Sequence, residues 1–288
     1  MLSTSWLAPV AALPPVGRLA DAAFVQVAHR RVAALDRMDV GKVQTATLLR
    51  LVRYARHTRF GREHDFARVR SVADFQRRVP VREYTAFWDA YWKADYPRLA
   101  GATWPDPVPY YALSSGTTSG TTKYVPVSRQ MLRSNGRAAL TTMALFRHAH
   151  PAAKLFTGRF FFLGGSTDLR PQADGSRAGD LSGIAAAEVA GVLRPYTYPP
   201  LDVGLMTDWE AKLAVMAEQS ARLPVTAVSG VPSWLLKLFD AVKQATGKRT
   251  VADVWPGLRL VVHGGTTFDP YRDLFAREVG DGVRFCEV

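Results

Sequence analysis

The chain has 288 residues, of which 48% are hydrophobic, and it carries a net charge of +12. This composition is typical of a soluble protein whose length allows one large domain or two small ones, and it excludes a chain too polar to form a core. The excess of arginine favours an anionic partner, which could be a nucleic acid, an acidic membrane surface, or a nucleotide or carboxylate substrate. No block of five or six basic residues is present, so arginine scattered over the surface is the favoured interpretation.

A single cysteine, Cys286, excludes an intramolecular disulfide and any metal site built from several cysteines, which fits a reducing cytoplasm. The apolar stretch 6–16 has no basic segment before it and contains three prolines, which argues against a cleaved signal peptide. The longest apolar runs are too short to cross a bilayer. We therefore expect a monomeric, cytoplasmic protein without a membrane partner.

The first hundred residues are predicted to be mainly helical. Apolar residues recur at helical spacing in 18–38 and 43–57, and Ser71 is placed to cap a short helix that ends at Arg78. Segment 83–96 is rich in aromatic residues. A platform for stacking nucleic-acid bases is one interpretation of that segment, but the spacing favours one helix face packed onto the core.

A run of hydroxyl residues and glycines follows, and it is the most informative feature of the chain. Residues 114–123 read Ser-Ser-Gly-Thr-Thr-Ser-Gly-Thr-Thr-Lys, with strands predicted at 108–113 and 124–127. Glycine allows the backbone to approach a ligand closely, so that successive N–H groups and the hydroxyls can surround one anion. Lys123 adds a compact positive charge. The run therefore predicts a loop that binds the phosphates of a nucleotide.

Two other interpretations of this run are less favoured. A flexible linker has a similar composition, but here apolar strands lie on both sides and no repeat is present. A Walker A loop needs a helix directly after its lysine, whereas a strand is predicted there. The loop is therefore expected inside a hairpin-like turn.

The middle of the chain continues with alternating elements. Ser128 is a suitable cap for a helix that reaches Phe146, and 159–163 is a buried strand closed by glycines. The polar stretch 168–183 is predicted to be the least ordered part and is a candidate for a mobile loop. A capping box at 207–210 is predicted to open the next helix.

The last third alternates strand, helix, strand, helix and strand from Pro224 onward. Short connections of this kind predict a parallel sheet with right-handed crossovers. Ligands of such sheets bind beyond the carboxyl ends of the strands. Those ends are Ser229-Gly230, His263-Gly264-Gly265 and the position after Val288.

Residues 111–126 resemble the first ATP motif of the GH3 auxin-responsive family, the acid-amido synthetases of the adenylate-forming superfamily. The superfamily shares the core [ST]-S-G-T-T-G-x-x-K. The doubled serine, the extra residue before Gly120 and the tail Lys-Tyr-Val-Pro are the features similar to GH3. Residues 261–271 resemble the strand and glycine turn beside the adenine. The resemblance implies an α/β fold, namely the N-terminal part of an adenylate-forming enzyme with a helical preamble and a wound mixed or parallel sheet with flanking helices.

The resemblance also implies a domain organisation. Residues 1–288 would be an incomplete N-terminal adenylation domain, composed of a helical preamble (1–100), a phosphate-loop region (101–223) and a βαβαβ segment (224–288). The second ATP motif of the family, Y-x-x-S-E, would begin just after Val288, and the C-terminal lid domain would be absent. We therefore expect the chain alone to bind ATP weakly at best and to be inactive.

The activity implied by the resemblance is ATP-dependent adenylation of a carboxylic acid, followed by transfer to the amine of an amino acid. Lys123 would act in catalysis. ATP would contact the loop and the glycine turn, through Ser114, Ser115, Gly116, Thr117, Thr118, Gly120, His263, Gly264 and Gly265. Mg²⁺ would bridge the phosphates, with its protein ligand beyond Val288, so no metal ligand is assigned in this chain.

Three side chains are candidates for contact with the acid. Arg147, like Arg137, lies on the helix where the family often places a residue that meets the acyl carboxylate. Ser182 and Trp234 are candidates for an acyl pocket, although packing or loop structure is the favoured role of both. A general-base role for His263 is not needed, because a carboxylate is already ionised, and a histidine hydrogen-bonded at a strand end is the preferred interpretation.

Other functions remain open at this point. An acyl- or aryl-CoA ligase of the same superfamily shares the first half-reaction. An inactive, truncated nucleotide-binding protein and a basic nucleic-acid-binding module are alternatives from other classes. Because no zinc-ligand pattern, RNA-recognition signature or basic-region heptad is present, no nucleic-acid partner is expected.

Overall fold

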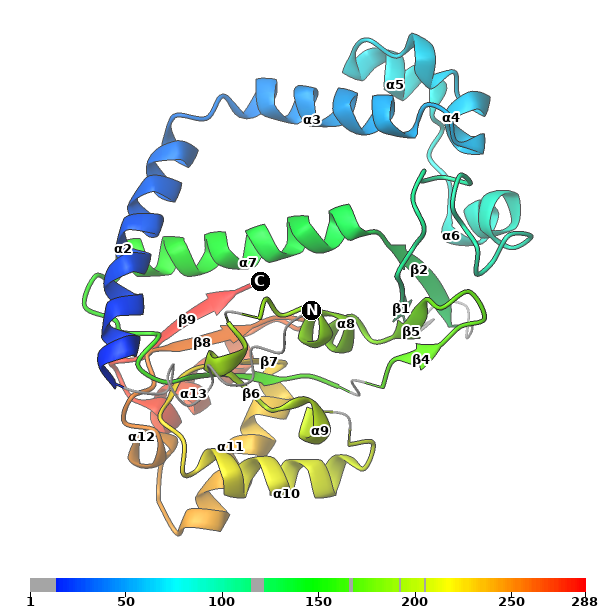
Figure 1. The fold of residues 1–288 in the computed structure, drawn as a ribbon. Helices are drawn as coiled ribbons and strands as arrows, with labels where there is room; N and C mark the ends of the chain where they lie inside the picture. Colours follow the sequence, from blue (N-terminus) through cyan, green and yellow to red (C-terminus); the bar gives the residue numbers. More distant parts are fainter. Residues whose placement is uncertain (1–13, 115–121, 166–167, 192, 205) are drawn as a thin grey trace. The chain divides into compact units, whose positions relative to one another are not determined.

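The computed structural model describes residues 14–114, 122–165, 168–191, 193–204 and 206–288 (Figure 1). This part of the chain divides into two compact units. The first unit comprises the described parts of Met1–Val32, Ala139–Asp168 and Ser182–Val288, and the second comprises those of Ala33–Ala138 and Leu169–Leu181. Each unit has its own sheet and its own hydrophobic core.

The first unit is built on a five-stranded sheet in the order β6-β3-β7-β8-β9. All its neighbouring strands are parallel, as the pattern after Pro224 predicted. Two strands from earlier in the chain extend this sheet beyond β7. The strands are β3 (Arg159–Leu163), β6 (Thr197–Tyr198), β7 (Val225–Gly230), β8 (Leu260–His263) and β9 (Arg284–Glu287).

Helices cover both faces of this sheet because its strands alternate buried side chains between two cores. Phe161, Val228 and Val261 belong to the core beneath the later helices. Their neighbours Phe160, Ala227 and Leu260 join the second core, with apolar residues of α2 and α7. A sheet buried on both faces is expected for parallel strands. The helices are α2 (Pro14–Asp36), α7 (Arg129–Ala149), α10 (Trp209–Ser220), α11 (Pro232–Thr246), α12 (Val251–Val254) and α13 (Arg272–Val279).

The helix starts of the first unit follow local chemistry, with one correction. Pro232 occupies the first turn of α11, where its missing N–H is not needed. The capping box predicted at 207–210 is wrong in detail, because Asp208 is the N-cap of α10 and accepts from the Ala211 N–H at 3.1 Å. Shorter elements complete the unit, namely α8 (Leu181–Ala187), η4 (Arg194–Tyr196), α9 (Leu201–Gly204) and η5 (Asp269–Tyr271).

The second unit contains a four-stranded sheet in the order β2-β1-β5-β4. Its strands are β1 (Tyr110–Ser114), β2 (Lys123–Val127), β4 (Arg170–Pro171) and β5 (Arg177–Gly179). The pair β1–β2 is antiparallel, and β5 adds to the other edge of β1 in parallel.

The polar stretch 168–183 is therefore not a loop throughout, and the expectation of a mobile loop is wrong for β4 and β5. These strands pair antiparallel across a turn in which Asp174 Oδ1 accepts from the backbone N–H and the hydroxyl of Ser176. Gly175 has a φ of +85°, which a glycine adopts readily. The hydrogen bonds of the turn at Asp174 and the pairing of β5 with the free edge of β1 thus order a segment that lacks an apolar pattern.

Most helices of the second unit lie in the predicted helical preamble, which the structure confirms. They are α3 (Val40–Ala55), α4 (Arg59–Glu63), η2 (Phe66–Arg68), α5 (Val72–Arg78), α6 (Tyr84–Phe87) and the π-helical turn η3 (Trp88–Trp92). Ser71 caps α5 by accepting from the Asp74 N–H, as predicted. Val52, Ala55, Phe66 and Val69 form the core beneath α3. Among the described residues, no helix combines the length and the apolar character that a membrane crossing requires.

Candidate functional site

Strands β1 and β2 hold the two ends of the hydroxyl and glycine run directly opposite each other. Their register pairs Ser114 with Lys123 and Leu113 with Tyr124. The strands predicted on both sides of the run are present. Its central residues lie outside the described part of the chain, and these include the predicted ligands Ser115, Gly116, Thr117, Thr118 and Gly120.

Lys123 begins β2 and lies against an aromatic ring. Its ammonium Nζ is 5.5 Å from the centre of the Tyr84 ring, within the range of a cation–π interaction. The Lys123 residue is half-buried. The ring therefore orients a positive charge at the point where the run of hydroxyls and glycines ends.

Tyr84 also fixes the backbone next to Lys123. The Tyr124 N–H donates to Tyr84 Oη at 2.8 Å, and the same hydroxyl donates to the Tyr124 carbonyl oxygen at 3.2 Å. Burial raises the pKa of Tyr84, so the hydroxyl keeps its proton near neutral pH. No local pattern distinguishes this tyrosine from the other aromatic residues of 83–96.

Tyr84→Phe should separate these two roles. Phenylalanine keeps the ring beside Lys123 but loses both hydrogen bonds to Tyr124, so we expect about a threefold to tenfold loss of ATP affinity. Tyr84→Ala removes the ring as well and should cost more. Titration calorimetry with ATP measures both values, and equal affinities of the wild type and both variants would contradict the role of Tyr84.

The other aromatic residues of 83–96 pack either against the hairpin, as Tyr96 does, or against Phe60 of α4, as Phe87 and Tyr91 do. Tyr96 lies 5.0 Å from Tyr111 and 5.3 Å from Tyr124, measured between ring centres. Burial is the main reason that the pKa of Tyr96 rises to about 12. Tyr91 is fully buried and donates to Glu63. The interpretation of this segment as core packing is therefore confirmed.

In the first unit, the carboxyl ends of three strands lie side by side. Gly230 of β7 pairs with His263 of β8, which pairs with Glu287 of β9. Directly after β8, Gly265 has a φ of +83°, and a Cβ on Gly264 would lie 2.5 Å from the Val288 carbonyl oxygen. The local backbone thus requires glycine at both positions. The close approach of a ligand to these glycines stays a prediction.

His263 is buried and stacks on Phe268, with 3.8 Å between the ring centres. Its Nδ1 has no hydrogen-bond partner among the described residues. Desolvation is the main cause that lowers the pKa of His263, which favours the neutral imidazole near pH 7. The sequence predicted a hydrogen-bonded histidine without specifying the ring nitrogen, and Nδ1 does not make such a bond.

A cavity of about 440 Å³ lies in the first unit at the carboxyl ends of β3 and β7. Its walls are mainly apolar and come from β3, α8, the segment 194–204 and α10. Ser182, a predicted substrate contact, lines it together with Ser229 at the end of β7. Trp234, the other predicted pocket residue, is not among the lining residues and packs on Trp209 at 5.1 Å.

Lys212 of α10 lines the same cavity and is only 2% exposed. Its Nζ donates to the carbonyl oxygens of Gly165 and Gly204, at 2.9 and 2.8 Å. Burial lowers the pKa of this amine. The sequence analysis did not identify Lys212. Its position four residues before the apolar Met216 places both on the same helix face, which could have indicated that Lys212 is buried.

Arg147 occupies a different environment from the cavity. It is buried at the end of α7 and donates through Nη1 to the carbonyl oxygens of His150, at 3.3 Å, and Pro151. These bonds hold the chain where it leaves the helix. A contact between Arg147 and an acid remains a prediction. Within the described ranges, no group of three His, Cys, Asp or Glu side chains could hold a metal ion.

The fold and the hairpin define the class of protein. A wound sheet with helices on both faces, together with a hairpin whose strands hold the two ends of the hydroxyl and glycine run, matches the fold expected for the N-terminal part of an adenylate-forming enzyme. The model of the GH3 family N-terminal domain matches residues 33–215. The chain belongs to the GH3 family.

Solved structures support this fold. The acyl acid amido synthetase AtGH3.15, in complex with 2,4-DB, matches with a TM-score of 0.72 and 12% identity over 90% of this chain and 54% of that chain. 2-Hydroxyisobutyryl-CoA ligase, with 2-HIB-AMP and CoA in the thioesterification state, matches with a TM-score of 0.53 and 16% identity over 87% of this chain and 49% of that chain. The chain thus spans about half the length of both proteins. No curated protein compared with the sequence matches it.

Proposed function

We propose that this chain contributes the adenylation half of an ATP-dependent acid ligase whose final acceptor is the amine of an amino acid. The observation that carries the proposal is the pairing of Ser114 with Lys123, which closes a GH3-like phosphate motif inside a hairpin. Family membership and the likeness of the fold to an acyl acid amido synthetase support it. In this proposal, residues 1–288 are part of an N-terminal adenylation domain, and the cytoplasmic location and monomeric state of the protein stay predictions.

The proposed chemistry is a displacement at phosphorus. An oxygen of the acid's carboxylate attacks the α-phosphorus of ATP, the bond to the bridging oxygen breaks, and pyrophosphate leaves with that electron pair. The protein mainly positions the reactants and neutralises charge. Backbone amides and hydroxyls of 114–120 and the ammonium of Lys123 are a donor set that fits phosphate oxygens. Mg²⁺ would neutralise further charge on the phosphates, and we assign it no ligand among the described residues.

We further propose that the cavity beside β3 and β7 takes the body of the acid. Its volume of about 440 Å³ suits a small organic molecule, and its apolar walls favour a hydrophobic acid. Ser182 and Ser229 are placed to donate hydrogen bonds to polar atoms of that acid. Gly264 and Gly265 would contact the adenine.

The experiment is ATP–pyrophosphate exchange that depends on an added carboxylic acid, measured with a panel of aromatic and branched aliphatic acids. It compares the 288-residue chain, for which little or no exchange is expected, with a protein that also carries the second ATP motif of the family. ATP binding is measured separately by titration calorimetry. Exchange stimulated by at least one acid supports the proposal. A protein that carries both ATP motifs and neither binds ATP nor exchanges pyrophosphate overturns it, and retention on nucleic acid with a steep salt dependence would then favour the basic binding module.

A CoA thiol is the second candidate for the acceptor. The similarity of the fold to 2-hydroxyisobutyryl-CoA ligase supports a CoA thiol as a candidate acceptor. Supplying amino acids or CoA to a mixture that forms the adenylate distinguishes the two, because only the correct acceptor turns acid and ATP into a stable amide or thioester. Thioester formation without amide would overturn the amine assignment.

Filling the cavity should change the choice of acid. Ala186 lines the cavity, whereas the next residue, Ala187, is not among the lining residues. Ala186→Leu should raise the half-saturating concentration of the largest accepted acid about tenfold while changing that of the smallest acid little, because added methylene groups occupy the same space. Ala187→Leu is the matched control. Equal effects of the two substitutions on large acids would contradict the placement of the acid in this cavity.

A further inference from the structure

Basic side chains are concentrated in the helical part of the second unit. Residues 39–82 contain 11 lysines and arginines but only 4 aspartates and glutamates, so this segment supplies more than half of the net charge of +12. The expectation of evenly scattered arginine is therefore incomplete. A local excess of this size raises the affinity for anions near these helices.

A hollow of about 600 Å³ lies among these helices. Phe66 and Val69 are buried beneath it, and the half-buried Leu49 adds to this apolar floor. Exposed cationic and polar groups surround the floor. We call the site the arginine hollow, and its lining residues are Leu49, Arg53, Arg56, His57, Phe66, Ala67, Val69 and Arg70.

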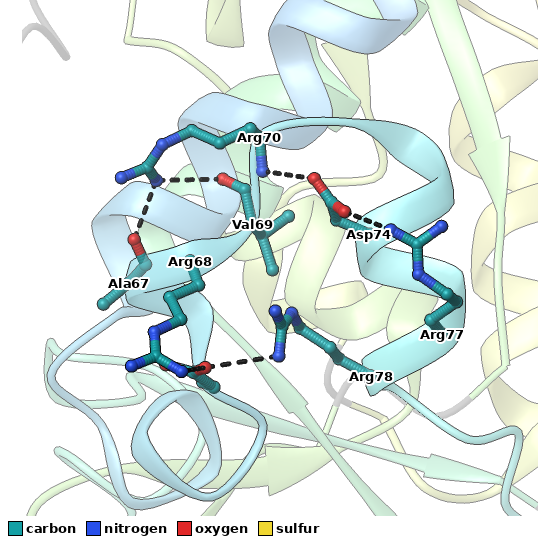
Figure 2. Close-up of polar contacts among 8 residues, drawn as sticks. Ala67, Arg68, Val69, Arg70, Asp74, Arg77 and Arg78 are labelled. Carbon is teal, nitrogen blue, oxygen red and sulfur yellow. Dashed lines mark hydrogen bonds and ion pairs between the residues drawn. The ribbon is translucent and has the colours of Figure 1, made fainter.

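The arginines next to the hollow form ion pairs with carboxylates. Asp65 forms ion pairs with Arg68 at 3.6 Å and with Arg78 at 3.2 Å, and Asp74 pairs with Arg77. Figure 2 shows Arg77 reaching Asp74 on α5, while the guanidinium of Arg70 turns away from that carboxylate. The two carboxylates compensate two of these three positive charges, and each of the three arginines already has an acidic partner.

The arginines that line the hollow differ in this respect. Arg53, Arg56 and Arg70 form no ion pair with a carboxylate in the described part of the chain. Arg70 Nη1 instead donates to the carbonyl oxygens of Ala67 and Val69, at 2.7 and 3.2 Å (Figure 2). The lining arginines thus keep their charge, and the backbone holds at least one of them in place.

The remaining contacts orient the other two guanidinium groups. Arg53 Nε donates to the Leu49 carbonyl oxygen at 3.4 Å, and Arg56 Nε donates to His57 Nε2 at 2.9 Å. In both cases the contact uses Nε, so the terminal Nη donors stay available. Guanidinium donors in this fixed geometry match the oxygen atoms of phosphate particularly well.

We propose that the arginine hollow binds an organic phosphate, namely a phosphate monoester with an apolar or planar body. Three uncompensated guanidinium groups suit a phosphate dianion better than a single carboxylate, and the floor of Phe66, Val69 and Leu49 suits the organic part. The volume is adequate for a ligand of this size. This site is separate from the hydroxyl and glycine run and does not depend on its proposed role.

The test is a calorimetric titration of the 288-residue chain with phenyl phosphate at low ionic strength. We expect saturable binding that is tighter than that of inorganic phosphate or benzoate. Arg53→Gln, Arg56→Gln and Arg70→Gln should each weaken it about tenfold, since each removes a charge-assisted hydrogen bond. Arg68→Gln and Arg77→Gln are matched controls with the same loss of charge, and they should change the affinity less than about twofold.

A vesicle experiment distinguishes two sources of the phosphate monoester. Binding to phosphatidate vesicles that phenyl phosphate displaces assigns a lipid headgroup, whereas phenyl phosphate binding without vesicle binding assigns a free metabolite, and both support the site. Lys123→Ala should leave phenyl phosphate binding unchanged. The proposal is overturned if phenyl phosphate does not bind at millimolar concentration, if the control substitutions weaken it equally, if Lys123→Ala abolishes it, or if only oligonucleotides bind.

Discussion

Lys123→Ala should weaken ATP binding about tenfold to a hundredfold and, in a protein that also carries the second ATP motif, should reduce acid-dependent pyrophosphate exchange by at least the same factor. The ammonium of Lys123 is held over the Tyr84 ring, at the end of the run that would surround the phosphates. A charge-assisted hydrogen bond to a phosphate oxygen contributes about 1.5–3 kcal/mol, which corresponds to this range of affinity. A group that also stabilises charge developing on the leaving pyrophosphate affects the rate more than the binding.

Two further variants make this prediction specific. Lys123→Arg keeps the charge but changes its geometry, so it should recover part of the ATP affinity and less of the exchange rate. Lys248→Ala removes an exposed lysine after α11 and tests the general effect of net charge. Titration calorimetry and exchange assays measure all three. An affinity for ATP that is unchanged by Lys123→Ala would remove the main support for the proposed function.

Local pattern was sufficient to predict the hairpin and the parallel sheet. The alternation of Phe160 with Phe161, and of Ala227 with Val228, places neighbouring side chains in different cores, which produces the continuous apolar runs seen in the sequence. The run of hydroxyls and glycines between two strands predicted where its ends would lie. These features depend on residues that are close together in the chain, so their physical causes can be found in a short window.

Contacts distant in sequence were harder to predict. Tyr84 reaches Tyr124 across forty positions, and nothing local distinguishes it from its aromatic neighbours. The β4–β5 hairpin depends on a turn at Asp174 and on the free edge of β1. The sequence also does not show which arginines form ion pairs. That depends on which carboxylate lies nearby in the fold, as Asp65 lies beside Arg68 and Arg78.

Lys212→Met should destabilise the first unit by about 2 kcal/mol. The substitution keeps a long apolar stem but leaves the carbonyl oxygens of Gly165 and Gly204 without the donor they have now. An unsatisfied buried acceptor costs about 1–3 kcal/mol, and relief from burying a charge offsets part of this loss. Lys237→Met, on the exposed side of α11, is the matched control and should change stability by less than about 0.5 kcal/mol. Urea denaturation monitored by circular dichroism measures both.

The pH dependence of this difference identifies the amine as its cause. Burial lowers the pKa of Lys212 below its ordinary value of 10.5, so between the folded value and 10.5 the unfolded chain binds more protons than the folded one. Stability conferred by Lys212 therefore rises with pH through that window and is smallest below the folded pKa. A neutral amine still has two N–H groups, enough for both carbonyl oxygens.

Comparison of the two chains at each pH isolates this effect. Buried tyrosines such as Tyr96, whose pKa rises to about 12, make the folded state less stable as pH rises above 10, but they do so equally in the wild type and in Lys212→Met. The difference in unfolding free energy between the two should therefore grow as the pH rises from the folded pKa of Lys212 to 10.5. If the difference in unfolding free energy between the wild type and Lys212→Met stays constant or shrinks over this range, Lys212 is not held as a desolvated amine. Other contacts would then join the walls of the cavity.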